Sequence, residues 1–251
     1  MKTRPPPPAH FGKHRVLLVD DHPFMREGLA KRINQESDLV VCGEAASARE
    51  ARRALARLRP DVVVLDLSLS DCLALDLIKD IKSLAPAAVV LVFTMHDEAV
   101  YAERALRAGA RGYIMKQEPP ERLLAGLRTV LRGEFSVSEK AEAGFLRSFF
   151  HQATPQGALS VSHLTNRELQ VFHLLGQGLG TQEIADRLDR SVKTIETHRA
   201  RIKQKLNLKN ASELISHAGR WLESEEGAAP GVAGGERFRH GHPGRDHPQP
   251  P

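Results

Sequence analysis

The chain has 251 residues, of which 41% are hydrophobic and 27% charged, and its formal net charge is +5. This length and composition predict one large or two small globular domains, and the positive charge suggests an anionic partner. The two cysteines exclude a disulfide framework, no apolar run approaches the roughly 18 residues of a membrane span, and the proline-rich start lacks the apolar part of a secretory signal. We therefore expect a cytoplasmic protein with no membrane association.

Strand and helix patterns alternate from residue 14 to residue 133. Short apolar runs predict strands over residues 16–19, 39–41, 61–66, 88–93 and 112–115. Helical spacing and a capping-box signature that begins at Ser47 predict helices over residues 25–34, 47–59, 75–84, 98–108 and 121–131. Five such units predict an α/β domain with a parallel sheet and helices on both faces.

The remaining chain predicts a different architecture. Residues 134–162 are a linker with a candidate helix over 139–150, and residues 163–223 form a second domain made only of helices. Capping residues Thr165, Thr181 and Ser191 predict three helix starts, and a last helix is expected over residues 211–222. Residues 1–13 and 224–251 are expected to be a disordered leader and a disordered tail. Three histidines of the tail lack the regular spacing of a metal site.

Acidic, hydroxyl and basic residues follow the strands of the first domain. Asp20 and Asp21 follow the first strand, Asp66 ends the third, and Thr94 and Lys116 follow the fourth and fifth. Ligands collect beyond the carboxyl ends of parallel strands, so these side chains are expected to converge. Clustered carboxylates favour Mg²⁺. An anion attached to Asp66 would then face Mg²⁺ on one side and the Thr94 hydroxyl and the Lys116 ammonium group on the other. Each residue alone would ordinarily be a turn residue, a cap or solvated surface.

The motifs that carry these residues resemble the receiver domain of two-component response regulators. They are Val19-Asp20-Asp21, Leu65-Asp66-Leu67, Thr94 and the segment from Gly109 to Lys116. The resemblance covers about residues 15–133. It implies a flavodoxin-like, doubly wound sheet of five parallel strands in the order 2-1-3-4-5, with Asp66 as the phosphoacceptor.

Further site residues are implied by the same resemblance. Mg²⁺ would be bound directly by Asp21, Asp66 and the carbonyl of Ser68, and by Asp20 through water. Thr94 and Lys116 would bind the phosphoryl oxygens. Tyr113 would be the aromatic side chain that swings inward when Thr94 moves, with a half-buried strand tyrosine as the less favoured alternative.

The loop after Asp66 departs from the family pattern. Ser70 and Ala74 stand where relatives usually have proline and glycine. Their loss changes loop stiffness and removes easy access to positive φ. Phosphorylation could therefore be slower or differently gated, but the nucleophile and the metal ligands are retained.

The segment 191–206 predicts an amphipathic helix with an apolar face toward the helices before it and a basic, polar face outward. Flanking cations suit phosphates and shorter central groups suit base edges, as a recognition helix requires. A solvated surface helix is the alternative for this segment in isolation.

Segments 164–168, 178–185 and 191–198 resemble the LuxR-type helix-turn-helix domain, which implies four helices with a dimer contact on the last. Together with a receiver, this places the chain with the NarL/FixJ class of response regulators. The expected DNA contacts are Thr181, Lys193, Thr194, Glu196, Thr197, His198, Ala200, Arg201 and Lys205.

The expected function is that of a transcription factor controlled by phosphorylation, not of an enzyme. Its expected partners are a sensor histidine kinase, double-stranded DNA and a second copy of the chain, with RNA polymerase as a further candidate. In relatives the receiver masks the recognition helix or controls dimerisation, and both modes stay open. So do three other functions: DNA binding that ignores phosphorylation, an aspartate-nucleophile phosphatase or dehalogenase, and a scaffold. Such phosphatases and dehalogenases typically have a second carboxylate two residues after the nucleophile, where this chain has Ser68.

Overall fold

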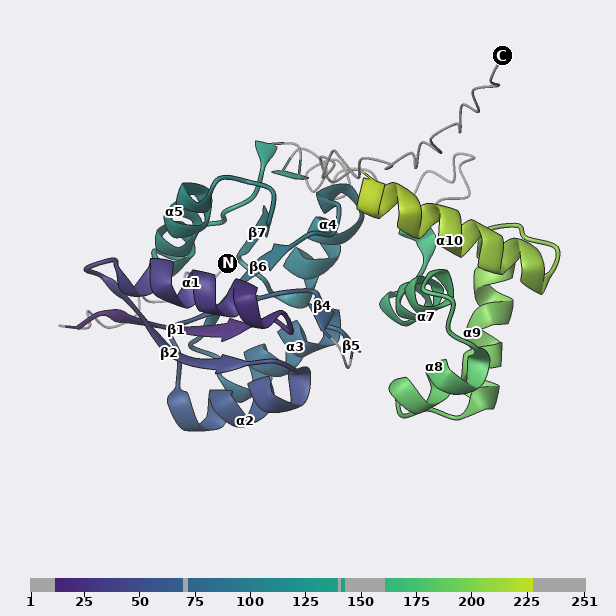
Figure 1. Ribbon diagram of the computed structural model, residues 1–251, viewed down its shortest axis with the longest axis horizontal. Coiled ribbons are helices and arrows are strands. Elements are labelled where there is room, and N and C mark those ends of the chain that lie inside the picture. Colours follow the sequence, from purple (N-terminus) through teal and green to yellow (C-terminus); the bar gives the residue numbers. More distant parts are fainter. Residues whose placement is uncertain (1–11, 70–71, 140, 143–160, 228–251) are drawn as a thin grey trace, which may run out of the picture.

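The computed structural model describes residues 12–69, 72–139, 141–142 and 161–227 (Figure 1). The strands of the main sheet are β1 (His14–Val19), β2 (Leu39–Ala45), β3 (Val62–Leu65), β6 (Val89–Thr94) and β7 (Gly112–Met115), and a small hairpin consists of β4 (Ser68–Leu69) and β5 (Cys72–Leu73). The helices of this domain are α1 (Pro23–Asn34), α2 (Ala48–Leu58), α3 (Leu75–Leu84), α4 (Glu98–Ala108) and α5 (Pro120–Leu131).

The main sheet is parallel throughout, with the strand order β2-β1-β3-β6-β7. Counted along the chain within this sheet, the order is 2-1-3-4-5, so the predicted topology is confirmed. Strand β1 lies inside the sheet, between β2 and β3, and its run of apolar residues is buried on both faces, as expected for a strand covered by helices on each side.

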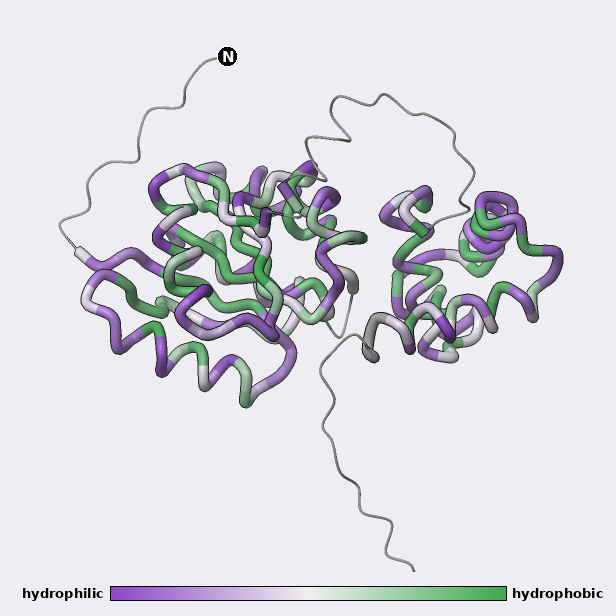
Figure 2. The backbone as a smooth tube through the Cα atoms, turned by 90° about the horizontal axis from the view of Figure 1, so that it is seen from above, coloured by the Kyte–Doolittle hydropathy of each residue, from purple (hydrophilic) through white to green (hydrophobic). Residues whose placement is uncertain are grey.

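Two separate packing layers cover the sheet. Alternate residues of β1 point to opposite faces: Val16 and Leu18 pack with residues of α1 and α5, and Leu17 and Val19 pack with residues of α2, α3 and α4. Figure 1 shows these helices around the sheet. The central strands are correspondingly hydrophobic, whereas hydrophilic residues are frequent on the outer loops and helices (Figure 2). Packing on two faces fixes the strand ends, and with them the residues that follow each strand.

The C-terminal domain begins with the 3₁₀ helix η1 (Val161–His163) and continues with four α-helices in the described part of the chain. These are α7 (Asn166–Gly176), α8 (Thr181–Arg187), α9 (Val192–Lys205) and α10 (Ala211–Gly227). A complete capping box at Thr165 and Glu168 begins α7, and the Ser191 hydroxyl begins α9 by accepting from the Thr194 amide. The predicted apolar face of α9 is buried against α7 and α8.

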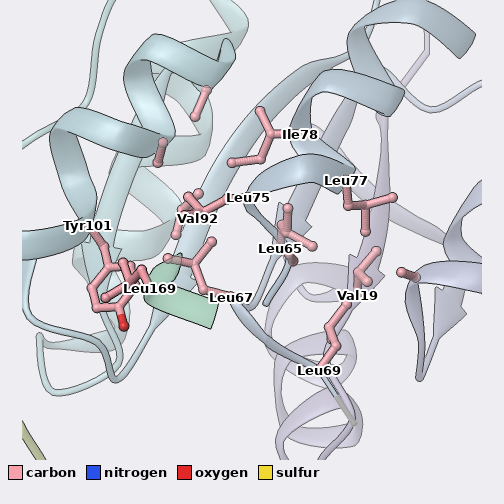
Figure 3. Packing of buried hydrophobic residues seen from close by; sticks show 14 of the residues in the cluster. Val19, Leu65, Leu67, Leu69, Leu75, Leu77, Ile78, Val92, Tyr101 and Leu169 are labelled. Atoms are coloured by element: carbon pink, nitrogen blue, oxygen red, sulfur yellow. The ribbon is translucent and has the colours of Figure 1, made fainter. Parts of the chain in front are cut away.

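Helix α7 also packs against the N-terminal domain. Leu169 lies beside Tyr101 and near Leu67 in one hydrophobic cluster that continues from the sheet into the C-terminal helices (Figure 3). Arg167 of α7 forms an ion pair with Asp76 of α3, with 2.9 Å between Nη2 and Oδ2. The two domains are therefore joined by apolar packing as well as by charge.

Several expectations need correction. Strand β2 continues four residues beyond residue 41, to Ala45, because pairing with β1 extends that far and Gly43 leaves room for Leu58 of α2. Helix α10 ends at Gly227, beyond the expected residue 222, so the start of the expected tail is helical. Thr181 does not cap α8, because Gly180 is the cap residue and its amide donates to Glu183, 2.6 Å away.

The remaining expectations concern segments at the edges of the described chain. Most of the candidate helix over 139–150 lies outside the described residues, as do the leader and most of the tail. At the start of the expected linker, Ser136 is buried and its carbonyl accepts from the Tyr113 amide, so this segment extends the first domain. Among the described residues, no helix has the length and apolar character needed to cross a membrane.

Candidate functional site

The carboxyl ends of β1, β3, β6 and β7 form one pocket. Pairing places the strand ends together: the Asp66 amide donates to the Val19 carbonyl and the Lys116 amide to the Thr94 carbonyl, each over 2.8 Å. Asp20 and Asp66 are both 3% exposed and Thr94 is fully buried. The convergence predicted from the strand ends is thus observed for the acids and the ammonium group, and Thr94 is buried at the end of the neighbouring strand β6.

Lys116 joins the two buried acids. Its Nζ atom lies 2.6 Å from Asp20 Oδ2 and 2.7 Å from Asp66 Oδ2, and the Lys116 side chain is 4% exposed. Burial alone would lower the pKa of Lys116, but the two carboxylates outweigh burial and the pKa is raised. Lys116 is therefore a firmly held cation at the carboxylate of Asp66.

The pocket also has the donors of a divalent cation site. Asp20, Asp21, His22 and Asp66 each offer a ligand atom within 4.8 Å of the others. The Oδ1 atom of Asp21 is buried without a good hydrogen bond, although the Nδ1 atom of His22 lies 2.8 Å away. Three carboxylates with such an oxygen fit a hard divalent ion. His22 was not among the predicted site residues. The one signal for it in the sequence is its position directly after Asp20 and Asp21.

The described residues of the loop after Asp66 pair through their backbones. Ser68 and Leu69 pair with Leu73 and Cys72 in the β4-β5 hairpin, and the Ala74 amide donates to the Leu67 carbonyl over 2.9 Å. Ala74 has φ −75°, a conformation open to any residue, so replacing the usual glycine here requires no positive φ. The lost access to positive φ therefore has no consequence at this position; Ser70 and Asp71 lie outside the described residues.

Tyr113 points inward. It is 2% exposed, and its hydroxyl donates to the carbonyl of His96 over 2.8 Å. The side chain is thus fully rather than half buried. His96 itself was not among the predicted site residues, yet it also bonds Ser68: its Nε2 atom lies 2.7 Å from the Ser68 hydroxyl. The signal in the sequence was its position two residues after Thr94.

The second candidate site is the outer face of α9. Of the nine predicted DNA contacts, five are exposed: Lys193, Glu196, Thr197, Ala200 and Arg201. Thr194 and His198 are partly buried at the edge of this face, and Thr181 accepts a hydrogen bond from Arg199. The exposed group combines two cations with short central side chains, as the sequence indicated.

Lys205 has a different environment from the rest of this set. Its Nζ atom lies 2.6 Å from Oε2 of Glu168, whose side chain is 3% exposed, and also donates to the carbonyl of His163. Burial would raise the pKa of Glu168, but the hydrogen bonds from Lys205 and Thr165 lower it. Lys205 therefore stabilises the inside of the domain in this structure.

Arg104 is a further residue that no sequence motif pointed to. From α4 it reaches the start of the C-terminal domain, where its two terminal nitrogens each donate over 2.7 Å, to the carbonyls of Leu164 and Ser162. Burial lowers the pKa of this guanidinium. Arg104 is thus a polar clamp between the two domains.

Two known protein families each match one part of the chain. Residues 16–128 match the profile described as "Response regulator receiver domain", and residues 162–218 match that of "Bacterial regulatory proteins, luxR family". The oxygen regulatory protein NreC of Staphylococcus carnosus is 36% identical over 212 residues, which cover 81% of this chain and 96% of that protein. NreC of Staphylococcus aureus is 36% identical over 211 residues with the same coverage.

Solved structures of a second relative share the fold. RcsB from Salmonella enterica serovar Typhimurium, bound to the promoter rprA in the presence of a phosphomimetic, is 26% identical with a TM-score of 0.64. The match covers 83% of this chain and 99% of that one. Since both domains and nearly the full length of these relatives are matched, the chain belongs to the NarL family of two-component response regulators, with an N-terminal receiver and a C-terminal LuxR-type DNA-binding domain.

Proposed function

We propose that Asp66 accepts a phosphoryl group from a partner sensor histidine kinase and that this modification controls binding of a homodimer to specific DNA sites, and so transcription. The observation that carries the proposal is the Asp66 carboxylate, buried beside Lys116 and grouped with Asp20 and Asp21, with Thr94 buried at the end of the neighbouring strand. A nucleophile, a fixed cation and a hydroxyl meet there. RNA polymerase is a candidate partner on the bound promoter.

The transfer can be written with these residues. A carboxylate oxygen of Asp66 attacks the phosphorus of a phosphohistidine, the bond from phosphorus to imidazole nitrogen breaks, and that nitrogen keeps the electron pair. Lys116 then stays beside the new acyl phosphate, and its ammonium is attracted to the phosphoryl oxygens. Thr94 supplies a hydroxyl that can donate to one of them. Asp20, which shares Lys116 with Asp66, would help to hold the cation of the site through water.

Mg²⁺ is the metal that best fits the pocket. Asp21, Asp66 and the Ser68 carbonyl would bind it directly and Asp20 through water. When bound, the ion neutralises the charge of the carboxylates and of the incoming phosphoryl group. Its carboxylate ligands are those already gathered within 4.8 Å of one another.

The outer face of α9 would enter the major groove. Lys193 and Arg201 would meet phosphates, Glu196 could accept from cytosine N4, and Thr197 and Ala200 could contact a thymine methyl group. RcsB was solved on its promoter DNA, and two RcsB dimers were solved bound to two parallel DNAs. In a dimer, two copies of α9 would occupy half-sites about one helical turn apart.

Control through dimerisation is favoured over masking. The five central residues of the α9 face are exposed while α7 is in contact with the receiver. DNA could therefore approach this face with the two domains still joined. The same observation favours a second candidate, DNA binding that does not depend on phosphorylation, and both agree with a DNA-binding regulator rather than an enzyme.

The chemistry is tested by intact mass after incubation with Mg²⁺ and acetyl phosphate. The wild-type chain should gain one phosphoryl group that is labile to base, and Asp66→Asn should gain none. Asp80→Asn, a partly exposed α3 residue paired with Arg52, is the matched control and should behave as wild type. Modification of Asp66→Asn at the wild-type level would rule out Asp66 as the acceptor.

The regulatory step is tested with duplexes selected from a random pool by the phosphorylated wild-type chain. Phosphorylation should tighten binding by about fivefold or more, a typical size for coupling between sites. Asp66→Asn should show no such gain. Equal affinity of the phosphorylated and unphosphorylated chains would favour the phosphorylation-independent candidate instead.

A further inference from the structure

His96 contacts three residues of the receiver pocket. Its Nε2 atom lies 2.7 Å from the Ser68 hydroxyl, its amide donates to Thr94 Oγ1 over 3.4 Å, and its carbonyl accepts from Tyr113. The amide of Ser68 in turn donates to Oδ1 of Asp66 over 3.2 Å. His96 is therefore bonded both to Ser68, which itself bonds Asp66, and to Thr94 at the end of the neighbouring strand.

The ring of His96 faces the C-terminal domain. Its centroid lies 5.4 Å from that of His173 in α7, in a nearly perpendicular arrangement, and 4.5 Å from that of Tyr101 in α4. His96 is 7% exposed. Through His173, a residue bonded to the receiver pocket touches a helix of the DNA-binding domain.

The ring contacts continue to α10. The His173 ring lies 6.3 Å from Trp221, and Phe172 lies 5.3 Å from the same indole. Trp221 belongs to the helix on which the family resemblance places the dimer contact. A chain of direct contacts thus leads from Asp66 through Ser68, His96 and His173 to Trp221.

We propose that His96 is a positioning residue that transmits the state of Asp66 to α7 and α10 through its contact with His173. The inference rests on the proposed phosphorylation of Asp66 and adds the route by which the DNA-binding domain senses it. Both attachments of His96 are to residues that the proposed phosphorylation would engage, Ser68 and Thr94. A phosphoryl group recruits the Thr94 hydroxyl, which now accepts from the His96 amide. The Ser68 carbonyl would also hold the metal, and the hydroxyl of the same residue bonds the imidazole of His96.

Docking of the domains has other supports. Arg104 bonds the carbonyls at the start of the C-terminal domain, and Arg167 pairs with Asp76. Loss of the imidazole contact therefore leaves the domains joined. Transmission and docking can therefore be measured separately. This separation is needed because proximity alone does not demonstrate coupling; coupling is demonstrated when removal of a contact changes the response.

Trp221 provides a direct measurement because it is the single tryptophan of the sequence. The full chain is phosphorylated with acetyl phosphate and Mg²⁺, the fraction modified is taken from intact mass, and the change in tryptophan emission is recorded on the same sample. The wild-type chain should show a change proportional to the phosphorylated fraction. In His173→Leu, which lies outside the receiver pocket, the adduct should form as in wild type while the change falls at least about fivefold.

Two replacements of His96 separate its two contacts. His96→Gln can retain the hydrogen bond to Ser68 without the ring, and His96→Phe can retain the ring without the bond. Both should lose the emission change at equal phosphorylation, whereas Arg107→Ala, an exposed residue of α4 outside the chain of contacts, should keep it. His173→Gln serves as a second α7 variant if His173→Leu unfolds, as judged by circular dichroism.

The outcomes distinguish this inference from the function on which it rests. A phosphorylated wild-type chain with unchanged emission, or His96 and His173 variants that are phosphorylated and keep the full change, would overturn transmission through His96 while leaving Asp66 phosphorylation intact. Absence of any adduct on the wild-type chain would overturn the proposed function, and this route with it.

Discussion

The receiver pocket and the outer face of α9 use charge in opposite ways. In the pocket, the side chains of Asp66 and Lys116 are at most 4% exposed and bonded to each other. On α9, Lys193, Glu196 and Arg201 are exposed and solvated. Buried charges depend on their partners, because an ion left unpaired in the interior is costly, whereas water replaces any partner at the surface. Changes in the pocket should therefore affect folding and function together, and changes on α9 should affect DNA binding alone.

The largest effect is expected for Lys116→Met. It leaves the Asp20 and Asp66 carboxylates buried without their cation, and should lower the free energy of unfolding by about 3 kcal/mol. Urea denaturation with and without Mg²⁺ measures this loss, and Mg²⁺ should restore part of it. Lys31→Met, an exposed α1 residue, is the control and should change stability by at most about 0.5 kcal/mol. Equal losses in both variants would contradict the contrast between buried and exposed charge.

A second buried charge lies within the DNA-binding domain. Lys205→Met removes the partner of Glu168, whose side chain is 3% exposed, and should destabilise the protein by about 2 kcal/mol. Glu168 retains its bond from the Thr165 amide, which limits the loss. The double variant Lys205→Met/Glu168→Gln should recover stability relative to Lys205→Met, as a double-mutant cycle in urea would show. Additive losses would mean that the pair contributes nothing.

These two cases show how far the sequence could predict the site. Asp66 and Lys116 were recognisable because the residues after parallel strands must share one edge of the sheet. Lys205 was assigned to DNA from its position on a basic helix, because a helical wheel does not show that the residue near its end meets Glu168 of another helix. Arg104, likewise, bonds main-chain carbonyls, which any sequence can supply. Contacts of a side chain with main-chain carbonyls, or with a residue of another domain, leave no pattern in the sequence from which they could be predicted.

The junction between the domains is intermediate in exposure, and Arg104→Ala should have an intermediate effect. It removes bonds from a cation to the Leu164 and Ser162 carbonyls, and should weaken docking by about 1.5 kcal/mol. Small-angle X-ray scattering should show a larger radius of gyration, while the circular dichroism of the helices is unchanged. Arg107→Ala is the matched control, since that residue pairs with Glu103 of its own helix. An unchanged radius of gyration would show that apolar packing at Leu169 is sufficient.

A smaller effect is expected from pH through His173. Burial lowers its pKa to about 4 from an ordinary value of 6.5, with smaller contributions from His96 and Arg187. The unfolded chain therefore binds the proton at higher pH than the folded chain does. The stabilisation is complete above pH 6.5 and declines as the pH falls toward 4. Between pH 7 and about pH 5.5 the loss is about 1 kcal/mol. Urea denaturation of His173→Gln should lack this component, and parallel pH profiles for variant and wild type would contradict it.

The smallest effect on stability is expected for Arg201→Ala, on the exposed face of α9. Because water already solvates its guanidinium, the free energy of unfolding should change by less than about 0.5 kcal/mol. Its loss should instead appear in DNA affinity: if Arg201 meets a phosphate, the slope of log affinity against log salt should decrease by about 1, on any duplex sequence. Lys205→Met is the control, because it removes one positive charge from the same helix. Since Lys205 is bonded to Glu168, this variant should leave the salt slope of DNA affinity unchanged under conditions in which it is folded. A reversal of the two results would assign the phosphate contact to Lys205 and show that its bond to Glu168 opens on DNA.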